Sequence, residues 1–294
     1  MSAYNQEMFA KISEAMKSTT GQTSNFGNVL RFKPGNTYTL RLLPNVESPL
    51  KTLFHYYFQG WNSLATGQYI SAISPSTWDE RDPISEAKFR LSKHGSEQEK
   101  EDSRLLTRRE NWLMNVYVVN DPTDGENNGK NKILRFGKQL HKIIMAGIEG
   151  EDSDEFGSRV FDLSADGCSL KIKVEEQGGY STYVSSRFAS AQKIPGLVDE
   201  ESINAVYKNI YDLENVFPIK SYDDLKVMLN EHFFCGDPES SEDKEQEEQE
   251  ANPIVKSVSA KTAKVDDDDD DDDDVPSYED DDTKVKDILA SMDL

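Results

Sequence analysis

The fold is decided by residues 104–142, RLLTRRENWLMNVYVVNDPTDGENNGKNKILRFGKQLHK. In the first half, Trp112, Met114, Val116 and Val118 alternate with other residues, which is the period-two pattern of a strand with one face on a core. The middle segment, NDPTDGENNG, is rich in residues that favour tight turns. The second half returns as another strand. The stretch therefore predicts a β-hairpin.

This hairpin is basic, although the chain as a whole is acidic. The 294 residues include 55 Asp plus Glu and 33 Lys plus Arg, which gives a formal net charge of −22. Yet no acid occurs between Asn127 and Ile148, or between Ala15 and Val46. The phosphates of a polyanion need Lys and Arg as partners. In and beside these windows we predict a binding face formed by Arg41, Arg108, Arg109, Lys130, Lys132, Arg135, Phe136 and Lys138.

Most of the negative charge belongs to the C-terminal end. Residues 239–294 contain 22 Asp plus Glu and 6 Lys, so residues 1–238 carry a net charge of only −6. The segment is of low complexity and includes nine consecutive aspartates, Asp266 to Asp274. Like charges at this density repel one another and bury nothing, so we expect a disordered tail. The tail ends in an apolar tip, suited to a contact with a partner, formed by Ile288, Leu289, Met292 and Leu294.

Strand patterns flank the hairpin on both sides. A strand is expected over residues 33–45, with Tyr38, Leu40 and Leu42 facing inward and Arg41 facing outward. Further strands, the first two of them rich in aromatic residues, are expected at 52–61, 67–73, 159–164 and 169–176. Two closing helices are expected at 199–217 and 221–234. The fold class is therefore mainly β with helices (α+β).

Residues 74–103 interrupt this pattern. They are polar and charged, and the segment PISEAKFRLSKHG suggests a short helix. We expect an insertion that contributes little to a core.

Aromatic residues point to unpaired bases as the polyanion. Single-stranded nucleic acid presents ring faces, so its grooves combine cations with exposed aromatic side chains. Tyr180 and Tyr183 lie in a Gly- and Ser-rich segment and are predicted to be stacking rings on a loop. For Trp112, the shared parity with Met114 and Val116 favours a place in the core instead.

The sequence lacks the motifs of common enzymes and of common metal sites. It contains no P-loop, no dinucleotide-binding glycine motif, no H-E-x-x-H and no G-x-S-x-G. The two cysteines, Cys168 and Cys235, form no C-x-x-C pair. No apolar run reaches the roughly 18 residues of a membrane span, and no secretory signal is visible. We expect a non-enzymatic, soluble, cytosolic protein without disulfides.

Several segments together carry a family resemblance. RRENWLMNVYVVNDP, KILRFGKQLHKI, SLKIKVEEQGGYSTY, IPGLVDEESI and SYDDLKVMLNEHF occur in this order between residues 27 and 235, followed by the acidic tail. The chain resembles the single-stranded-DNA-binding protein of T-even-type phages. The resemblance implies an N-terminal self-association arm (1–26), an OB-fold-based core (27–235) with an inserted subdomain at about 56–103 and flanking helices, and a tail (236–294).

The resemblance also implies a mode of action. The family coats single-stranded DNA cooperatively in the host cell cytoplasm, and its tail engages replication and recombination proteins. Its cooperativity motif is similar to Lys17, Ser18 and Thr19, with one lysine where relatives cluster several basic residues. Its groove positions match Arg108, Arg109, Arg135, Phe136, Tyr180 and Tyr183.

One feature of the family is missing from this sequence. Members commonly hold a structural zinc with one His and three Cys in the insertion. His55 matches the His, but residues 56–103 contain no Cys, so no zinc site of that kind can form. We expect no cofactor. The insertion is then held by packing, through Tyr69, Trp78 and Phe89, or it is looser than in relatives.

Two functions are open at this point. The first is coating of single-stranded DNA in phage replication, recombination and repair, with the tail recruiting partners and competing with DNA for the groove. The alternative is an acidic scaffold or DNA mimic. A mimic should be acidic across its folded part, whereas residues 1–238 keep two windows without acids. For the aspartate run itself, a purely solubilising role is the alternative to competition.

Overall fold

The computed structural model describes residues 25–197 and 199–236. The expected arm residues Lys17, Ser18 and Thr19 lie outside this part of the chain. So do the tail and its tip residues Ile288, Leu289, Met292 and Leu294. Within the described part, no helix is both long and apolar enough to cross a membrane.

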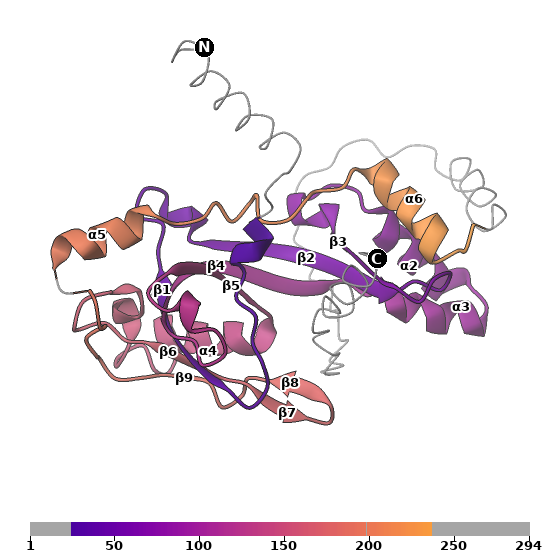
Figure 1. Cartoon of the computed structure of the whole chain (residues 1–294). Coiled ribbons are helices and arrows are strands. Elements are labelled where there is room, and N and C mark those ends of the chain that lie inside the picture. Colours follow the sequence, from indigo (N-terminus) through magenta and orange to yellow (C-terminus); the bar gives the residue numbers. More distant parts are fainter. Residues whose placement is uncertain (1–24, 198, 237–294) are drawn as a thin grey trace, which may run out of the picture.

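A seven-stranded sheet forms the centre of the molecule (Figure 1). Its strands follow the order β3 (Tyr69–Ile73), β2 (Leu53–Asn62), β4 (Arg109–Asn120), β1 (Thr37–Leu43), β6 (Leu170–Lys173) and β9 (Arg187–Phe188), and β5 (Asn131–Phe136) pairs with β4. Every strand pairing in the sheet is antiparallel. The α+β class predicted from the sequence is confirmed, and the OB-fold stays a prediction.

The predicted hairpin at 104–142 is strands β4 and β5. Trp112 pairs with Phe136, and the register continues to Tyr117 opposite Asn131. The other edge of β4 pairs first with β2, over residues 109–114, and then with β1, over residues 115–120. Strand β4 is the longest strand of the sheet and pairs with three others, β1, β2 and β5. It is buried on both faces.

One face of β4 lies on the main core. Trp112, Met114, Val116 and Val118 are buried there with residues of β1, β6 and α4 (Lys138–Ile148), as the period-two pattern predicts. The opposite face is also covered, because Leu113 and Tyr117 belong to two further apolar clusters. Two covered faces explain why apolar residues continue through almost the whole of β4.

A segment after α5 (Glu200–Lys208) covers this second face. The side-chain amide of Asn115 donates to the carbonyl of Tyr211 and accepts from its N–H, both at 2.9 Å. The amide of Asn131 donates to the carbonyls of Val206 at 2.8 Å and Asn209 at 2.6 Å. The sequence predicts one helix over 199–217, but helix α5 ends at Lys208. Two buried asparagines instead bind the backbone beyond it.

The helical lobe comprises α2 (Pro83–His94), α3 (Glu97–Asp102), η4 (Ser103–Leu106) and α6 (Tyr222–His232). Figure 1 shows β2 and β4 running from the part of the molecule around α4 into this lobe. Trp61, Ile84, Leu106 and Leu229 are buried together in a separate apolar cluster. The expectation that residues 74–103 add little to a core is therefore wrong, because α6 supplies the apolar partner 120 residues or more later in the chain.

The aromatic residues expected to hold the insertion do so only in part. The side chain of Phe89 is 63% exposed, so its expected packing role is wrong. Trp78 packs beside Phe54, with ring centroids 6.4 Å apart, in a cluster outside the helical lobe. Buried polar contacts act beside the apolar cluster. The Asp82 carboxylate accepts from the hydroxyls of Ser74 and Ser85, at 2.5 and 2.8 Å, and from the N–H of Ile84.

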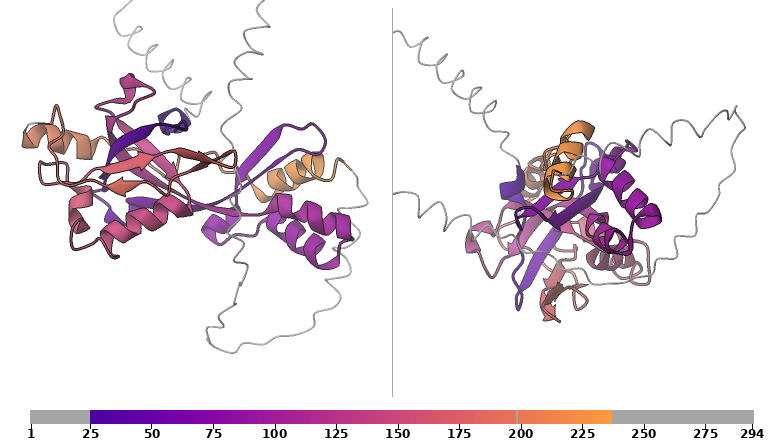
Figure 2. Two further views of the ribbon diagram at one scale, coloured as in Figure 1. Left: turned by 90° about the horizontal axis from the view of Figure 1, so that it is seen from below. Right: turned by 90° about the vertical axis from the view of Figure 1, so that its right-hand side faces the viewer.

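A second, two-stranded sheet is formed by β7 (Glu175–Gln177) and β8 (Tyr180–Thr182). Gly178 and Gly179 make its turn with φ values of 63° and 86°, a backbone conformation that side-chain-bearing residues rarely adopt. Figure 2 shows this hairpin extending away from the main sheet in the direction of the helical lobe. Tyr180 therefore lies on a strand of a hairpin, whereas the sequence suggests a loop.

Candidate nucleic-acid interface

A row of aromatic rings crosses the sheet on the face opposite the Tyr211 segment. The ring of His55 lies 4.9 Å from that of Tyr57 and 5.2 Å from that of Trp112, measured between centroids. On the far side of Trp112, the ring of His141 stacks at 4.1 Å with an interplanar angle of 19°. The row arises because Tyr57 and His55 share a face of β2, and His55 pairs with Trp112 in register.

Two cations lie beside this row. The guanidinium carbon of Arg108, an exposed residue just before β4, lies 4.0 Å from the centroid of the Tyr57 ring. The Lys138 ammonium lies 3.9 Å from the carboxylate of Glu110, which also approaches His55 Nε2 at 3.3 Å. We call this surface the His55 face, formed by Arg108, Tyr57, His55, Glu110, Lys138, Trp112 and His141.

Accessibility differs along the His55 face. The side chain of His55 is 40% exposed and that of Lys138 is 71% exposed. Trp112 is buried between the two histidines, which agrees with the core role favoured by its parity. Burial lowers the pKa of His141, and Glu110 opposes this effect. Burial therefore favours the neutral form of the His141 ring, and the exposed side chains of His55, Arg108 and Lys138 are groups that a ligand can reach.

Two other predicted arginines lie on the opposite face of the sheet. The guanidinium carbon of Arg135 lies 4.7 Å from the ring centroid of Phe58 and 5.8 Å from that of Phe217. Arg109 is the register partner of Phe58 and has the same parity as Leu113, the partner of Arg135. The structure therefore separates Arg109 and Arg135 from Arg108 and Lys138, because neighbouring residues of a strand point to opposite faces.

Arg135 has a structural neighbour in Tyr56. Burial raises the pKa of Tyr56 to about 12, and the positive charge of Arg135 acts in the opposite direction. The Tyr56 hydroxyl is buried, and the Arg135 guanidinium is the charged donor that acts on it. A cation beside this hydroxyl and two aromatic rings gives Arg135 a packing role in addition to any contact with a ligand.

Two predicted binding residues are buried. Arg41 is fully buried; its guanidinium donates to the carbonyl of Asp162 at 2.7 Å and to that of Gln192. The expectation that Arg41 faces outward is wrong, because both faces of β1 are covered, and burial lowers its pKa. Phe136 is 3% exposed in the main core, where its ring lies 6.2 Å from that of Trp112. Neither side chain is accessible to DNA in this structure.

The two predicted stacking tyrosines differ from each other. Tyr180 is 40% exposed on the β7–β8 hairpin. Tyr183 is half-buried: its ring packs edge-on against Phe32 with centroids 6.3 Å apart, and its N–H donates to the Gln139 side chain at 3.0 Å. Tyr180 therefore keeps the exposure that stacking requires, whereas Tyr183 belongs to the rim of the main core.

Lys130 and Lys132 lie away from the His55 face, around a cavity at the edge of β5. Tyr57 and His55 belong to the candidate interface, although they are not among the binding residues predicted from the sequence. A signal for them exists, since TLFHYYFQGW places both on one parity of a strand. Among the described residues, no group of three or more His, Cys, Asp or Glu gathers as a metal site would require.

Comparison with known proteins gives consistent matches. A family model described as gp32 DNA binding protein like matches residues 33–231. The chain is 24% identical over 215 residues to the single-stranded DNA-binding protein of Enterobacteria phage T4, covering 70% of this chain and 67% of that relative. It is 29% identical over 132 residues to the protein of the same name from Enterobacteria phage T2, covering 43% of each. These matches confirm the expectation of a binding protein rather than an enzyme.

Proposed function

The chain belongs to the gp32-like family of DNA-binding proteins, and from this premise we propose that it binds single-stranded DNA at the His55 face. The observation that carries the proposal is the row of rings with the cations Arg108 and Lys138 beside it. Unpaired bases stack on aromatic side chains, and their phosphates attract Lys and Arg. The names of the T4 and T2 relatives support the same ligand.

Arg108 and Tyr57 have paired roles in this proposal. In the free protein the guanidinium covers one face of the Tyr57 ring. A base that stacks on this ring displaces the guanidinium, which then meets the neighbouring phosphate. Tyr180 adds an exposed ring from the β7–β8 hairpin. Lys138, beside Glu110, contributes a further phosphate contact.

The proposal extends to the setting in which the protein acts. We propose an OB-fold-based core, cooperative coating of the strand through the arm at 1–26, and work in phage DNA replication, recombination and repair in the host cytoplasm. The acidic tail competes with DNA and recruits partner proteins through its tip. The supports are the family match, the charge of residues 239–294 and the apolar tip sequence.

The acidic scaffold or DNA mimic makes a different prediction. A mimic binds the DNA site of another protein and has no affinity for DNA itself. Equilibrium binding of fluorescently labelled oligo-dT and of a labelled duplex, each at two salt concentrations, separates the two functions. We expect tight, salt-sensitive binding of oligo-dT and weak binding of the duplex. Absence of binding to either DNA at low salt would leave the mimic as the better explanation.

Variants of Tyr57 test the site itself. Replacing Tyr57 by Leu removes a ring of the row, and we expect a loss of roughly 1–3 kcal/mol in oligo-dT binding. Tyr57→Phe keeps the ring and should keep the affinity, so it is the matched control. Circular dichroism should show that both variants fold. Wild-type affinity in the Leu variant would place the DNA elsewhere on the protein.

A further inference from the structure

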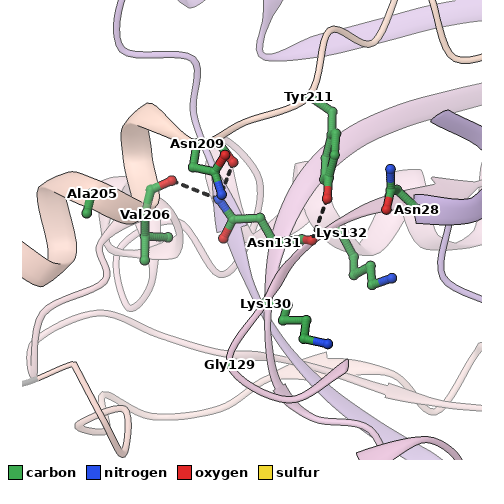
Figure 3. Close-up of a pocket in the computed structure, with 9 residues that line it drawn as sticks. All are labelled: Asn28, Gly129, Lys130, Asn131, Lys132, Ala205, Val206, Asn209 and Tyr211. Carbon is green, nitrogen blue, oxygen red and sulfur yellow. Dashed lines mark hydrogen bonds between the residues drawn. The ribbon is translucent and has the colours of Figure 1, made fainter. Parts of the chain in front are cut away.

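A polar cavity of about 500 Å³ opens at the outer edge of β5, away from the His55 face. Three segments that are far apart in the sequence build it: η1 (Asn25–Asn28), the start of β5 and the end of α5 with the residues after it. Its lining, shown in Figure 3, comprises Asn28, Gly129, Lys130, Asn131, Lys132, Ala205, Val206, Asn209 and Tyr211. The volume is within the range of small-molecule sites in proteins.

The charge of this lining is unusual for the chain. It includes two lysines and no acid, although the whole chain carries 55 acids against 33 Lys and Arg. Figure 3 shows the side chains of Lys130 and Lys132 projecting to the same side, where Asn28 lies. Two ammonium groups without a carboxylate among the lining residues favour an anion in the space between them.

The rest of the lining is held in place by hydrogen bonds. Asn131 binds the backbone carbonyls of Val206 and Asn209, and the Tyr211 hydroxyl donates to the carbonyl of Asn131 at 3.3 Å. On the other side, the N–H of Leu30 donates to the carbonyl of Ile133 at 2.8 Å, which fixes η1 against β5. The cavity is therefore formed before any ligand enters, which reduces the entropy cost of binding.

We propose that this cavity is a second nucleotide-binding site, with a phosphate between Lys130 and Lys132 and the base against Tyr211 and the amides of Asn28 and Asn209. The inference rests on the proposed function, because the ligand is a nucleotide of the strand bound at the His55 face. Lysine supplies the charge, and side-chain amides supply donors and acceptors for a base edge. The site adds nucleotides to the length of strand that one protein covers.

The test compares oligo-dT of increasing length with the double variant Lys130→Gln/Lys132→Gln. Long oligomers reach both sites, so in this variant the slope of log affinity against log salt should flatten by about 0.7, since the cavity holds one phosphate and each single-strand phosphate contact contributes about 0.7. Oligomers that are too short to extend from the His55 face to the cavity should bind the variant and the wild type equally. The control is Lys193→Gln/Lys220→Gln, which removes two exposed lysines outside both sites.

Other outcomes would contradict the inference and leave the proposed function unaffected. If the cavity variant matches the wild type at every length and salt concentration, the cavity binds no nucleotide of the strand. If the control pair flattens the slope equally, the effect is one of overall charge. Failure of the wild type to bind oligo-dT would instead remove the proposed function itself.

Free thymidine monophosphate distinguishes the source of the nucleotide. If the cavity binds a nucleotide of the strand, thymidine monophosphate at about mM concentration should leave the melting temperature unchanged. The salt slope of long oligo-dT binding should still differ between the double variant and the wild type. A rise in melting temperature that the double variant lacks, without any effect on long oligo-dT, would assign the cavity to a free nucleotide and overturn the strand assignment.

Discussion

Glu110 sets the charge of the His55 face, because its carboxylate approaches both His55 and Lys138. The pairing draws the Lys138 ammonium toward an acid and away from phosphates. A single carboxylate in the middle of a cationic row therefore weakens the attraction for a polyanion, and it does so most strongly at low salt.

Replacing Glu110 by Gln tests this role. Lys138 then becomes available for a phosphate, so we expect tighter oligo-dT binding at low salt and a salt slope steeper by about 0.7. The measurement is a salt series of oligo-dT titrations. Glu214→Gln is the control, because Glu214 forms a similar exposed pair with Lys51 at 3.1 Å. Unchanged affinity in the Glu110 variant would show that this carboxylate does not limit DNA binding.

Asp121 anchors the turn between β4 and β5. One carboxylate oxygen accepts from the N–H groups of Thr123 and Asp124 and from the Thr123 hydroxyl, and the other accepts from the Asn127 amide. Burial alone would raise the pKa of Asp121, but these hydrogen bonds outweigh it and lower the pKa. The charged form is thus the form that stabilises the turn.

The sign of the pH dependence follows from the lowered pKa of Asp121. The stabilisation is present above the unfolded-state value near 3.8 and is lost as pH falls through the folded-state pKa. In Asp121→Asn, an amide NH2 group replaces the carboxylate oxygen that accepts from the Asn127 amide, so two donors face each other. We expect it to lower the free energy of unfolding by about 1–3 kcal/mol at neutral pH. Urea denaturation between about pH 2 and 7 should show a smaller acid-induced loss in the variant. An equal loss in both proteins would contradict the assignment.

Single residues were the hardest feature to predict from the sequence. Arg41 alternates with apolar residues, as an outward-facing residue would, yet it is buried because the segments around Asp162 and Gln192 cover that face. Strand parity assigns a side chain to a face but does not reveal what covers it. Trp112 shares its parity with Met114 and Val116 and is buried with them, as predicted. Arg108 and Arg109 are predicted to lie on one binding face, but they are neighbours in the chain and lie on opposite faces of the sheet.

At the scale of elements, the segment after α5 depends on two asparagines rather than on apolar packing alone. Asn115 satisfies both the N–H and the carbonyl of Tyr211. Replacing Asn115 by Leu removes the side-chain partner of these two partly buried backbone groups. We expect a loss of about 1–3 kcal/mol in the free energy of unfolding, measured by urea denaturation.

A control separates this hydrogen-bond effect from general disruption of the sheet. Asn111→Leu changes the same residue type on the same strand and parity, at a position that is only half-buried. It should cost less than Asn115→Leu. Equal losses would show that the pairing with Tyr211 adds nothing beyond packing.

Local pattern predicted most of the elements. The hairpin 104–142, the strand over 33–45 and the capped helix at 221–234 are confirmed, because their signals are local: period-two alternation, turn residues and the Ser221–Asp224 capping box. The strand expected over 169–176 is confirmed only in part, because it divides into β6 and β7 of two different sheets. The break after Lys208 was not predicted. Ile210 and Leu213 continue a helical spacing, but the buried amides that bind this backbone lie on strands remote in sequence.

For the whole molecule, we propose that the helical lobe needs no structural metal. Its stability comes from the apolar cluster around Trp61, Ile84, Leu106 and Leu229 and from the buried contacts of Asp82. The apolar cluster joins α2 to α6. A sequence pattern cannot show this pairing, because the two helices are distant in the chain and each alone resembles a surface helix.

The metal proposal predicts that a chelator leaves the melting temperature unchanged. Leu229→Ala should instead lower the free energy of unfolding by about 2–5 kcal/mol, because it opens a cavity in the cluster. Thermal and urea unfolding with and without a chelator measure both effects. Stoichiometric zinc in the purified protein, or a chelator-dependent fall in melting temperature, would refute the proposal.

Strand β4 finally has a consequence for how the molecule opens. Its residues 112–117 are paired on both edges and packed on both faces, and the same strand extends toward the helical lobe. Local fraying cannot release these backbone amides, so their hydrogen–deuterium exchange should require the largest opening that the molecule undergoes. The amides of the β7–β8 hairpin should exchange much earlier. The amides of residues 112–117 should thus be the last in the described part of the chain to exchange with solvent.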